Sequence, residues 1–371
     1  MTLFLIPIQI SLCQNPIETW NLNIPFDSSR TKSLYFKVES FNFFDNAEYA
    51  SPHITGATFI GTKDRLYLDY YLSPSLRIQT GVNVLKFSGR KEFSNIAEYF
   101  SLFYQPNSFI TFSIGDIDFS KIPSLDDAIY YRQNLSYESN TKGMFVQFLT
   151  KFSNSAIFLN WRKFILPGDP YQEEFWAGFF NTFSWSVSDQ LSVDFPINLS
   201  GYHRGGEIDN TALGKESIVN SKNGIELTWK QANHKFTLGS FLLTFWETTD
   251  NSRYPFSKGY GINSQINYGW KPFSLSVGYW HSYRYFSPLG HPLFNSYTFD
   301  KPNHIYNYQD FINFELGTKW GIDNIGYLLF DGEFRYDSRR NRLNFFTGIK
   351  LIISEEFFLT KVKKKILNEN Q

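Results

Sequence analysis

The sequence predicts an all-β protein, a transmembrane antiparallel up-and-down β-barrel of about 16 strands. Aromatic residues make up 19% of the 371 residues while hydrophobic residues reach only 42%, so apolar side chains must be interleaved with polar ones. From residue 33 onward, apolar and polar residues alternate in segments of about ten residues, the length of a strand that crosses a membrane. The connections between these segments are alternately short and long, which is typical of outer-membrane barrels.

The N-terminus carries an apolar run at residues 3–12. Because about 7–15 apolar residues are too few to span a bilayer, we interpret residues 1–13 as a signal peptide and residues 14–32 as a periplasmic segment. No basic residue precedes the run, so a first strand is the alternative interpretation. Cleavage near Cys13, the only cysteine, would leave a mature chain without disulfides or cysteine chemistry.

The strands are assigned from their period of two. Residues 191–199 and 273–279, for example, place apolar side chains on one face and mostly polar ones on the other. Seven tight turns and eight longer connections separate such segments within residues 33–353, the expected barrel, which gives 16 strands. Residues 54–72 could form one strand or two, and residues 174–187 lack a clean apolar face, so 14 or 18 strands also fit.

The charged residues indicate which face of the strands meets the lumen. A cationic side chain that faces lipid costs about 2–4 kcal/mol at the bilayer midplane, so the charged face should be the inner one. Positive and negative charges nearly balance there, which predicts either a pore with weak charge selectivity or a closed barrel filled by salt bridges across the lumen. The expected pore-lining residues are Arg65, Asp69, Arg77, Arg162, Asp194, Glu226, Lys230, Glu315, Lys319, Asp331, Glu333, Arg335 and Lys350.

Tryptophan side chains near the inferred strand ends support a membrane location. Such residues gather at membrane–water interfaces, where an apolar ring and a polar N–H group are both accommodated. The tryptophans expected in these two girdles are Trp161, Trp176, Trp185, Trp229, Trp246, Trp280 and Trp320.

The third long connection, residues 119–141, is a candidate constriction. In 16-stranded porins the third loop folds inward, and by analogy this loop would narrow the channel. An outward loop is the alternative. The candidate constriction residues are Asp126, Asp127, Tyr130, Tyr131 and Arg132.

Residues 75–82, 85–89, 161–165 and 168–175 combine strand alternation with turn-forming residues. Through them, the sequence over roughly residues 56–200 resembles porin-like outer-membrane β-barrel proteins of Bacteroidota. The resemblance implies a barrel in the outer membrane of a Gram-negative bacterium and brings no catalytic residues with it.

Catalytic chemistry is expected to be absent. The six histidines are scattered, and none has the spacing of a metal site. Ser282 next to His281 could begin a hydrolase site, but adjacent residues of a strand point to opposite faces. We therefore predict no enzyme activity, no catalytic, cofactor-binding or metal-binding residues, and no cofactor.

The predicted function is a channel for passive diffusion of small hydrophilic solutes. The alternative is a closed barrel that acts as a structural or assembly component of an outer-membrane complex. A soluble secreted β-sandwich that binds glycans is a third, less favoured interpretation.

The expected partners are outer-membrane lipid, the barrel assembly machinery, and either further copies of this chain in a homo-oligomer or other proteins of an envelope complex. Nucleic acid is not among them, because 35 Lys and Arg residues balance 35 Asp and Glu residues and leave no basic excess. Residues 354–371 include a basic run and are expected to form a solvated periplasmic tail.

Overall fold

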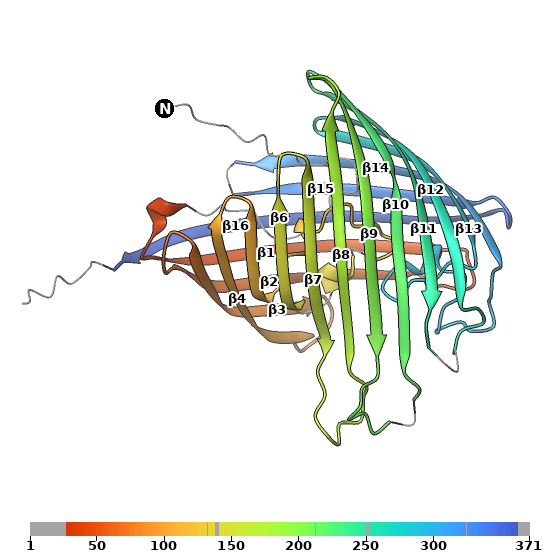
Figure 1. Cartoon of the computed structure of the whole chain (residues 1–371), viewed down its shortest axis with the longest axis horizontal. Coiled ribbons are helices and arrows are strands. Elements are labelled where there is room, and N and C mark those ends of the chain that lie inside the picture. The colour runs from red at the N-terminus through yellow and green to blue at the C-terminus, as the bar shows by residue number, and fades with distance from the viewer. Residues whose placement is uncertain are drawn as a thin grey trace, which may run out of the picture.

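The protein is a closed barrel of 16 antiparallel strands in which each strand pairs with its neighbours in sequence and β1 pairs with β16 (Figure 1). The computed structural model describes residues 27–131, 133–137, 141–211, 213–249, 253–323 and 325–362. The predicted fold class and strand number are confirmed. The expected signal peptide, much of the N-terminal segment and most of the basic tail lie outside the described residues. The strands are β1 (Ser33–Tyr49), β2 (Ala57–Tyr71), β3 (Leu76–Phe87), β4 (Asn95–Asn107), β5 (Ile110–Asp116), β6 (Lys142–Leu149), β7 (Ser153–Lys163), β8 (Glu174–Ser186), β9 (Leu191–Arg204), β10 (Glu216–Gln231), β11 (His234–Glu247), β12 (Lys258–Trp270), β13 (Phe273–Tyr283), β14 (Tyr308–Ile322), β15 (Gly326–Asp337) and β16 (Arg342–Lys361).

Helical structure is limited to short turns. One α-helical turn, α1, covers Asn134–Tyr137, and three 3-10 turns cover Ser28–Arg30, Phe119–Lys121 and Pro292–Phe294. Within the described ranges, no helix has the length and apolar character needed to cross a bilayer.

Strand alternation separates an apolar outer face from a polar inner face. On β9, Phe195 and Leu199 are 41% and 51% exposed on the outside, whereas Asn198 and Tyr202 are buried on the inside. A barrel with such an outer face buries it in hydrocarbon, and closure leaves no strand edge unpaired. The fold therefore supports the predicted location in the outer membrane of a Gram-negative bacterium.

The barrel ends later than the sequence pattern indicated. β16 continues to Lys361, which is in register with Ser33, rather than ending at residue 353. Side chains of β1 contact this extension. The rings of Phe36 and Phe357 stack with centroids 6.4 Å apart, and Nζ of Lys37 forms an ion pair with the Glu356 carboxylate at 2.7 Å. These cross-strand contacts stabilise the closing pair of strands.

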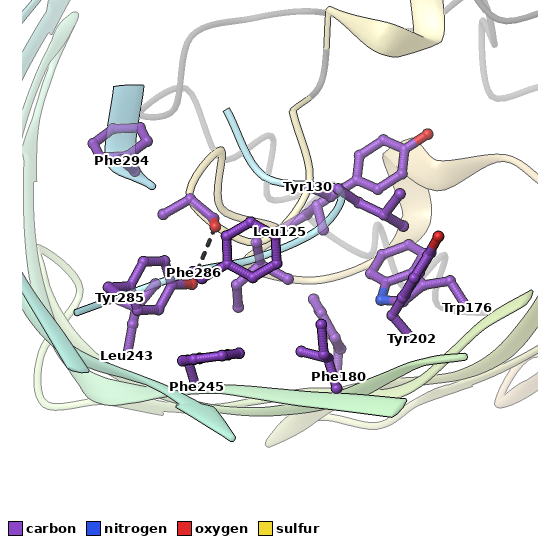
Figure 2. Close-up of a cluster of buried hydrophobic side chains, with 14 of the residues drawn as sticks. Leu125, Tyr130, Trp176, Phe180, Tyr202, Leu243, Phe245, Tyr285, Phe286 and Phe294 are labelled. Carbon is purple, nitrogen blue, oxygen red and sulfur yellow. Dashed lines mark hydrogen bonds between the residues drawn. The ribbon is translucent and has the colours of Figure 1, made fainter. Parts of the chain in front are cut away.

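Two long loops enter the barrel instead of extending into solvent. Hydrogen bonds join the loop between β5 and β6 to the loop between β13 and β14. The Tyr285 hydroxyl donates to the carbonyl oxygen of Ala128 at 3.0 Å. The N–H of Tyr131 donates to the carbonyl oxygen of Leu289 at 2.7 Å. Figure 2 shows Leu125 and Phe286 of these loops beside Phe180 and Phe245, which point inward from β8 and β11. The lumen therefore contains a shared apolar core.

This core corrects the assignment of two tryptophans. Trp176 and Trp280 were expected in the interfacial girdles, but both side chains are buried inside the barrel, at 2% and 0% exposure. Trp176 stacks on Tyr130 with ring centroids 4.9 Å apart, and Trp280 packs edge-on against Phe294 at 4.8 Å. Apolar loops inside the lumen make an inward-facing indole favourable there.

Candidate active site

The thirteen expected pore-lining residues all lie on the inward-facing positions of their strands. Many form ion pairs within the lumen. Arg77 binds Asp69 at 2.6 Å and Lys350 binds Asp331 at 2.9 Å. Their role as the lining of an open pore stays a prediction.

The candidate constriction residues belong to the loop that enters the lumen. Asp126 forms an ion pair with Lys222 of β10 at 2.9 Å, and Tyr130 stacks on Trp176. The carbonyl oxygen of Asp127 accepts a hydrogen bond from the N–H of His291, in the other inward loop, at 2.7 Å. The ring of Tyr131 contacts the same histidine at 4.2 Å. Arg132 lies outside the described residues, and a constriction function for this loop stays a prediction.

The adjacent pair His281 and Ser282 points to opposite faces of β13. The hydroxyl of Ser282 is fully buried in the lumen and lies 3.4 Å from the side-chain oxygen of Gln309. The ring of His281 is on the outer face, where its Nδ1 lies 2.7 Å from the carboxylate of Asp310 on β14. These two residues therefore cannot act together on one substrate.

A different serine and histidine meet on the outer face of the barrel. His203 and Ser217 are directly paired across β9 and β10, each within one residue of the end of its strand where a long loop begins. The Ser217 Oγ lies 2.8 Å from Nδ1 of His203. The other ring nitrogen, Nε2, lies 2.5 Å from the carbonyl oxygen of Gly205. The three groups form one hydrogen-bonded chain.

The order of groups in this hydrogen-bonded series determines which atom donates in each hydrogen bond. A carbonyl oxygen only accepts, so Nε2 of His203 must carry the proton in the neutral ring. Nδ1 then has a free lone pair and accepts a hydrogen bond from the Ser217 hydroxyl. This is the arrangement of a nucleophile, a general base and an orienting acceptor.

The surrounding chain positions both partners. Gly205 has φ of +99°, and a Cβ there would lie 3.2 Å from Nε2 of Gln172 and from Cα of Lys215. The glycine thus allows a tight turn that brings its carbonyl back to His203. The backbone of Ser217 is held by Thr248 and Thr249: the N–H of Thr248 donates to the Ser217 carbonyl at 2.9 Å, and the Thr249 hydroxyl accepts from the Ser217 N–H at 3.2 Å.

The pair lies on the lipid-facing surface of the barrel. Both side chains are half-buried and share the outer face with apolar residues such as Leu199 and Ile197, which are 51% and 44% exposed. In the part of the chain that the structure describes, no group of three or more His, Cys, Asp and Glu residues could hold a metal ion.

Sequence reasoning missed this pair because the two residues are separated by a loop. His203 was grouped with the other scattered histidines. The parity of β9 places it on the face of Leu199, and this signal was present in the sequence. Its contact with Ser217, however, depends on the register between β9 and β10. The irregular loop between these strands does not allow that register to be predicted from the sequence.

Solved structures share the fold. A loop-deletion mutant of OmpT, an outer-membrane protein of Vibrio cholerae, superposes with a TM-score of 0.51 and 11% identity, over 86% of this chain and 99% of that chain. OccAB1 of Acinetobacter baumannii gives a TM-score of 0.50 and 8% identity, over 89% of this chain and all of the other. At these identities the likeness shows an outer-membrane barrel and nothing finer. No curated protein matches the chain.

A family model described as Lipid A 3′-O-deacylase-type matches residues 26–362. This is an enzyme family, so the prediction that the protein has no enzyme activity is wrong. The resemblance to porin-like proteins is correct for the barrel, but the porin-like identity itself is not shown. The match extends over nearly the whole chain, and the protein belongs to the Lipid A 3′-O-deacylase-type family.

Proposed function

We propose that the protein is an outer-membrane esterase that removes a fatty-acyl chain from lipid A. The observation that carries this proposal is the hydrogen-bonded chain of Ser217, His203 and the Gly205 carbonyl on the lipid-facing rim. The family description supplies the substrate and the reaction class. Polar side chains that face lipid are costly, and they are retained where they serve a function.

The first chemical step forms an acyl-enzyme. The Ser217 oxygen attacks the ester carbonyl while Nδ1 of His203 removes its proton, which leaves an imidazolium that donates through both nitrogens. The Gly205 carbonyl accepts from Nε2 throughout and holds the ring in place. Collapse of the tetrahedral intermediate breaks the ester bond, and Nδ1 returns the proton to the departing sugar oxygen.

The second step releases the fatty acid. A water molecule gives a proton to Nδ1 of His203 and attacks the acyl carbonyl, and Ser217 leaves with the proton that His203 returns. The water oxygen ends in the carboxylic acid and the serine hydroxyl is restored. One ester and one water yield one alcohol and one fatty acid, so the reaction needs no cofactor or oxidant.

Passive diffusion is less well supported. The two inward loops and the aromatic residues of β8, β11 and β13 pack together across part of the lumen. Small solutes would have to pass beside this core and between ion-paired side chains. A closed barrel is compatible with the proposed esterase, because the reaction takes place on the outer face.

The experiment compares two serines of β10 on the same face. The wild-type chain, Ser217→Ala and Ser221→Ala are refolded into detergent micelles with lipid A, and released fatty acid is measured by mass spectrometry. Ser221 is a matched control because it faces outward and bonds Thr244 at 2.7 Å, with no histidine in that contact. We expect Ser217→Ala alone to abolish release. If Ser217→Ala keeps wild-type activity while folded, the assignment of the nucleophile is wrong.

A further inference from the structure

A second polar cluster lies on the outer face at the same end of the barrel. Its centre is Asp310, near the start of β14, which faces outward with Tyr308. The Tyr279 hydroxyl donates to Asp310 at 2.7 Å and Nδ1 of His281 lies at 2.7 Å. Arg339, from the loop between β15 and β16, binds the second carboxylate oxygen through Nε. The carboxylate thus holds one guanidinium in a fixed position.

A second arginine is fixed in a similar way. Arg284 follows β13 directly, and its backbone φ of +50° is uncommon for a residue with a side chain. Its N–H and its Nε both donate to Asn307, at 2.9 Å and 2.8 Å. Its guanidinium carbon lies 5.0 Å from the ring centre of Tyr283.

The two arginines flank one pair of aromatic rings. Tyr283 and Tyr308 are paired across β13 and β14, with ring centroids 4.9 Å apart. The guanidinium carbon of Arg339 lies 5.3 Å from the Tyr308 ring. The order Arg284, Tyr283, Tyr308, Arg339 therefore forms a continuous surface on the outer rim.

Both guanidinium groups keep their terminal nitrogens available. Each arginine is anchored through Nε, and across the described ranges no acceptor is bonded to the terminal nitrogens of either side chain. Arg339 is 45% exposed. Each guanidinium is held in place through Nε and has terminal nitrogens that bind no acceptor among the described residues. Each can therefore bind oxygens of a phosphate group, which arginine does with paired hydrogen bonds.

We propose that Arg284 and Arg339 form a binding site for the phosphorylated sugar headgroup of an outer-leaflet glycolipid, the class to which lipid A belongs. The inference rests on the proposed esterase, whose substrate it would orient. The cluster on β13 and β14 and the Ser217 site on β10 lie on the same lipid-facing rim, and a glycolipid with several acyl chains is wide enough to contact more than one strand. Tyr283 and Tyr308 would contact sugar, as aromatic rings at a membrane interface do. Asp310 is a positioning residue, since it holds Arg339 and has no contact with substrate in this scheme.

The test measures binding without hydrolysis. All variants carry Ser217→Ala, are reconstituted in nanodiscs, and are titrated with fluorescent lipid A or with the same lipid A after phosphatase treatment. The double variant Arg284→Gln/Arg339→Gln is compared with Arg90→Gln, an exposed arginine in the loop between β3 and β4. The two single variants are included in case the double variant does not fold, and folding is checked by the heat-dependent gel shift of barrels.

The expected result is a tenfold or greater loss of affinity for phosphorylated lipid A in the double variant. Affinity for the dephosphorylated lipid should be unchanged, and Arg90→Gln should bind both lipids normally. Arg284→Lys/Arg339→Lys should restore part of the binding, because charge is kept while paired hydrogen bonding is lost. In the active protein, Arg284→Gln/Arg339→Gln should raise KM and leave kcat within a few-fold of wild type.

Three outcomes would overturn the proposal. The first is an equal loss of affinity for both lipids, which would indicate a role in packing alone. The second is unchanged binding in the folded double variant. The third is inorganic phosphate that displaces lipid A at the same concentration as the lipid itself, which would indicate a site for free phosphate. These affinity measurements do not require an active Ser217. Failure of the esterase proposal would therefore be seen separately, as a wild-type protein that binds lipid A and releases no fatty acid.

Discussion

Many polar side chains are paired and buried in the lumen of this barrel, whereas at the outer rim some of them reach the lipid-facing surface. In the lumen, Lys222 is fully buried and bonded to Asp126, and Arg77 and Asp69 are closed into a similar pair. At the rim, Ser217 and His203 form a chain that ends in a hydroxyl at the lipid-facing surface. Charges that are paired and buried stabilise one arrangement of the chain, whereas a polar chain with an accessible end can act on a substrate. Under the proposed function, this difference assigns the chemistry to the outer face and a structural role to the paired charges inside.

The strongest test of this comparison sets two of the outward-facing histidines, His203 and His281, against each other. We expect His203→Asn to lower kcat by at least about a thousandfold, because the general base is lost while the ring position is filled by a polar group. The double variant His203→Asn/Ser217→Ala should lose no more than either single variant, since the two groups act as one unit. His281→Asn should change KM more than kcat. Steady-state rates of fatty-acid release are measured for Ser217→Ala, His203→Asn, the double variant and His281→Asn. Additive losses in the double variant would contradict the proposal that Ser217 and His203 act as one unit.

The lumen is tested by breaking its buried ion pair. Lys222→Met leaves the carboxylate of Asp126 buried without its cation, and such a loss typically costs about 3–5 kcal/mol. We expect a lower unfolding temperature in the gel-shift assay and normal release of fatty acid at temperatures where the barrel is folded. Lys222→Met/Asp126→Leu should recover most of the stability, because no charge is then left unpaired. A large drop in kcat for the folded single variant would contradict the separation of the two regions.

Acid should loosen the packing between long loops before it affects the barrel wall. His53, in the loop after β1, packs against Tyr306 with ring centroids 4.9 Å apart, and burial together with the nearby charge of Arg340 lowers its pKa to about 4. His291, in the inward loop after β13, also has a pKa below its usual range because it is buried. An unfolded histidine titrates near 6.5, so the unfolded chain binds more protons than the folded one between that pH and about 4. Stability is complete above pH 6.5 and falls as the pH falls.

The expected loss for His53 is about 2 kcal/mol between pH 6.5 and pH 5. Limited proteolysis of the loops at both pH values measures it, with the barrel wall as internal reference. His53→Phe should remove its share of the pH dependence, whereas His234→Phe, at the exposed first residue of β11, should not. Cleavage that rises equally in both variants would show that other groups cause the acid effect.

Sequence patterns predicted the parts of this structure that depend on local alternation. The period of two and the alternation of short and long connections gave 16 strands, and parity placed residues such as Arg77 and Lys350 on the inner face. The contents of the lumen were not predicted, because Trp176 and Trp280 turn inward only where distant loops supply apolar partners. The proposed active-site pair was missed for a similar reason: the sequence shows on which face His203 lies, but its contact with Ser217 depends on cross-strand register.

The smallest expected effect concerns the acceptor that orients His203. Gly205→Ala places a side chain on a backbone with φ of +99° and 3.2 Å from Nε2 of Gln172 and Cα of Lys215, so the turn or these neighbours must move by a few tenths of an ångström. Displacement of the carbonyl by a few tenths of an ångström weakens the hold on Nε2, and we expect kcat to fall by about tenfold, which corresponds to about 1.4 kcal/mol. Gly168→Ala is the matched control, because its φ of +98° carries the same strain but a Cβ there meets no atom within 4 Å. Both variants should lose a similar amount of stability, and only Gly205→Ala should lose rate. Equal rates in the two variants would mean that the Gly205 carbonyl does not orient the base. The proposed reaction at the outer rim would then depend on the serine–histidine contact alone.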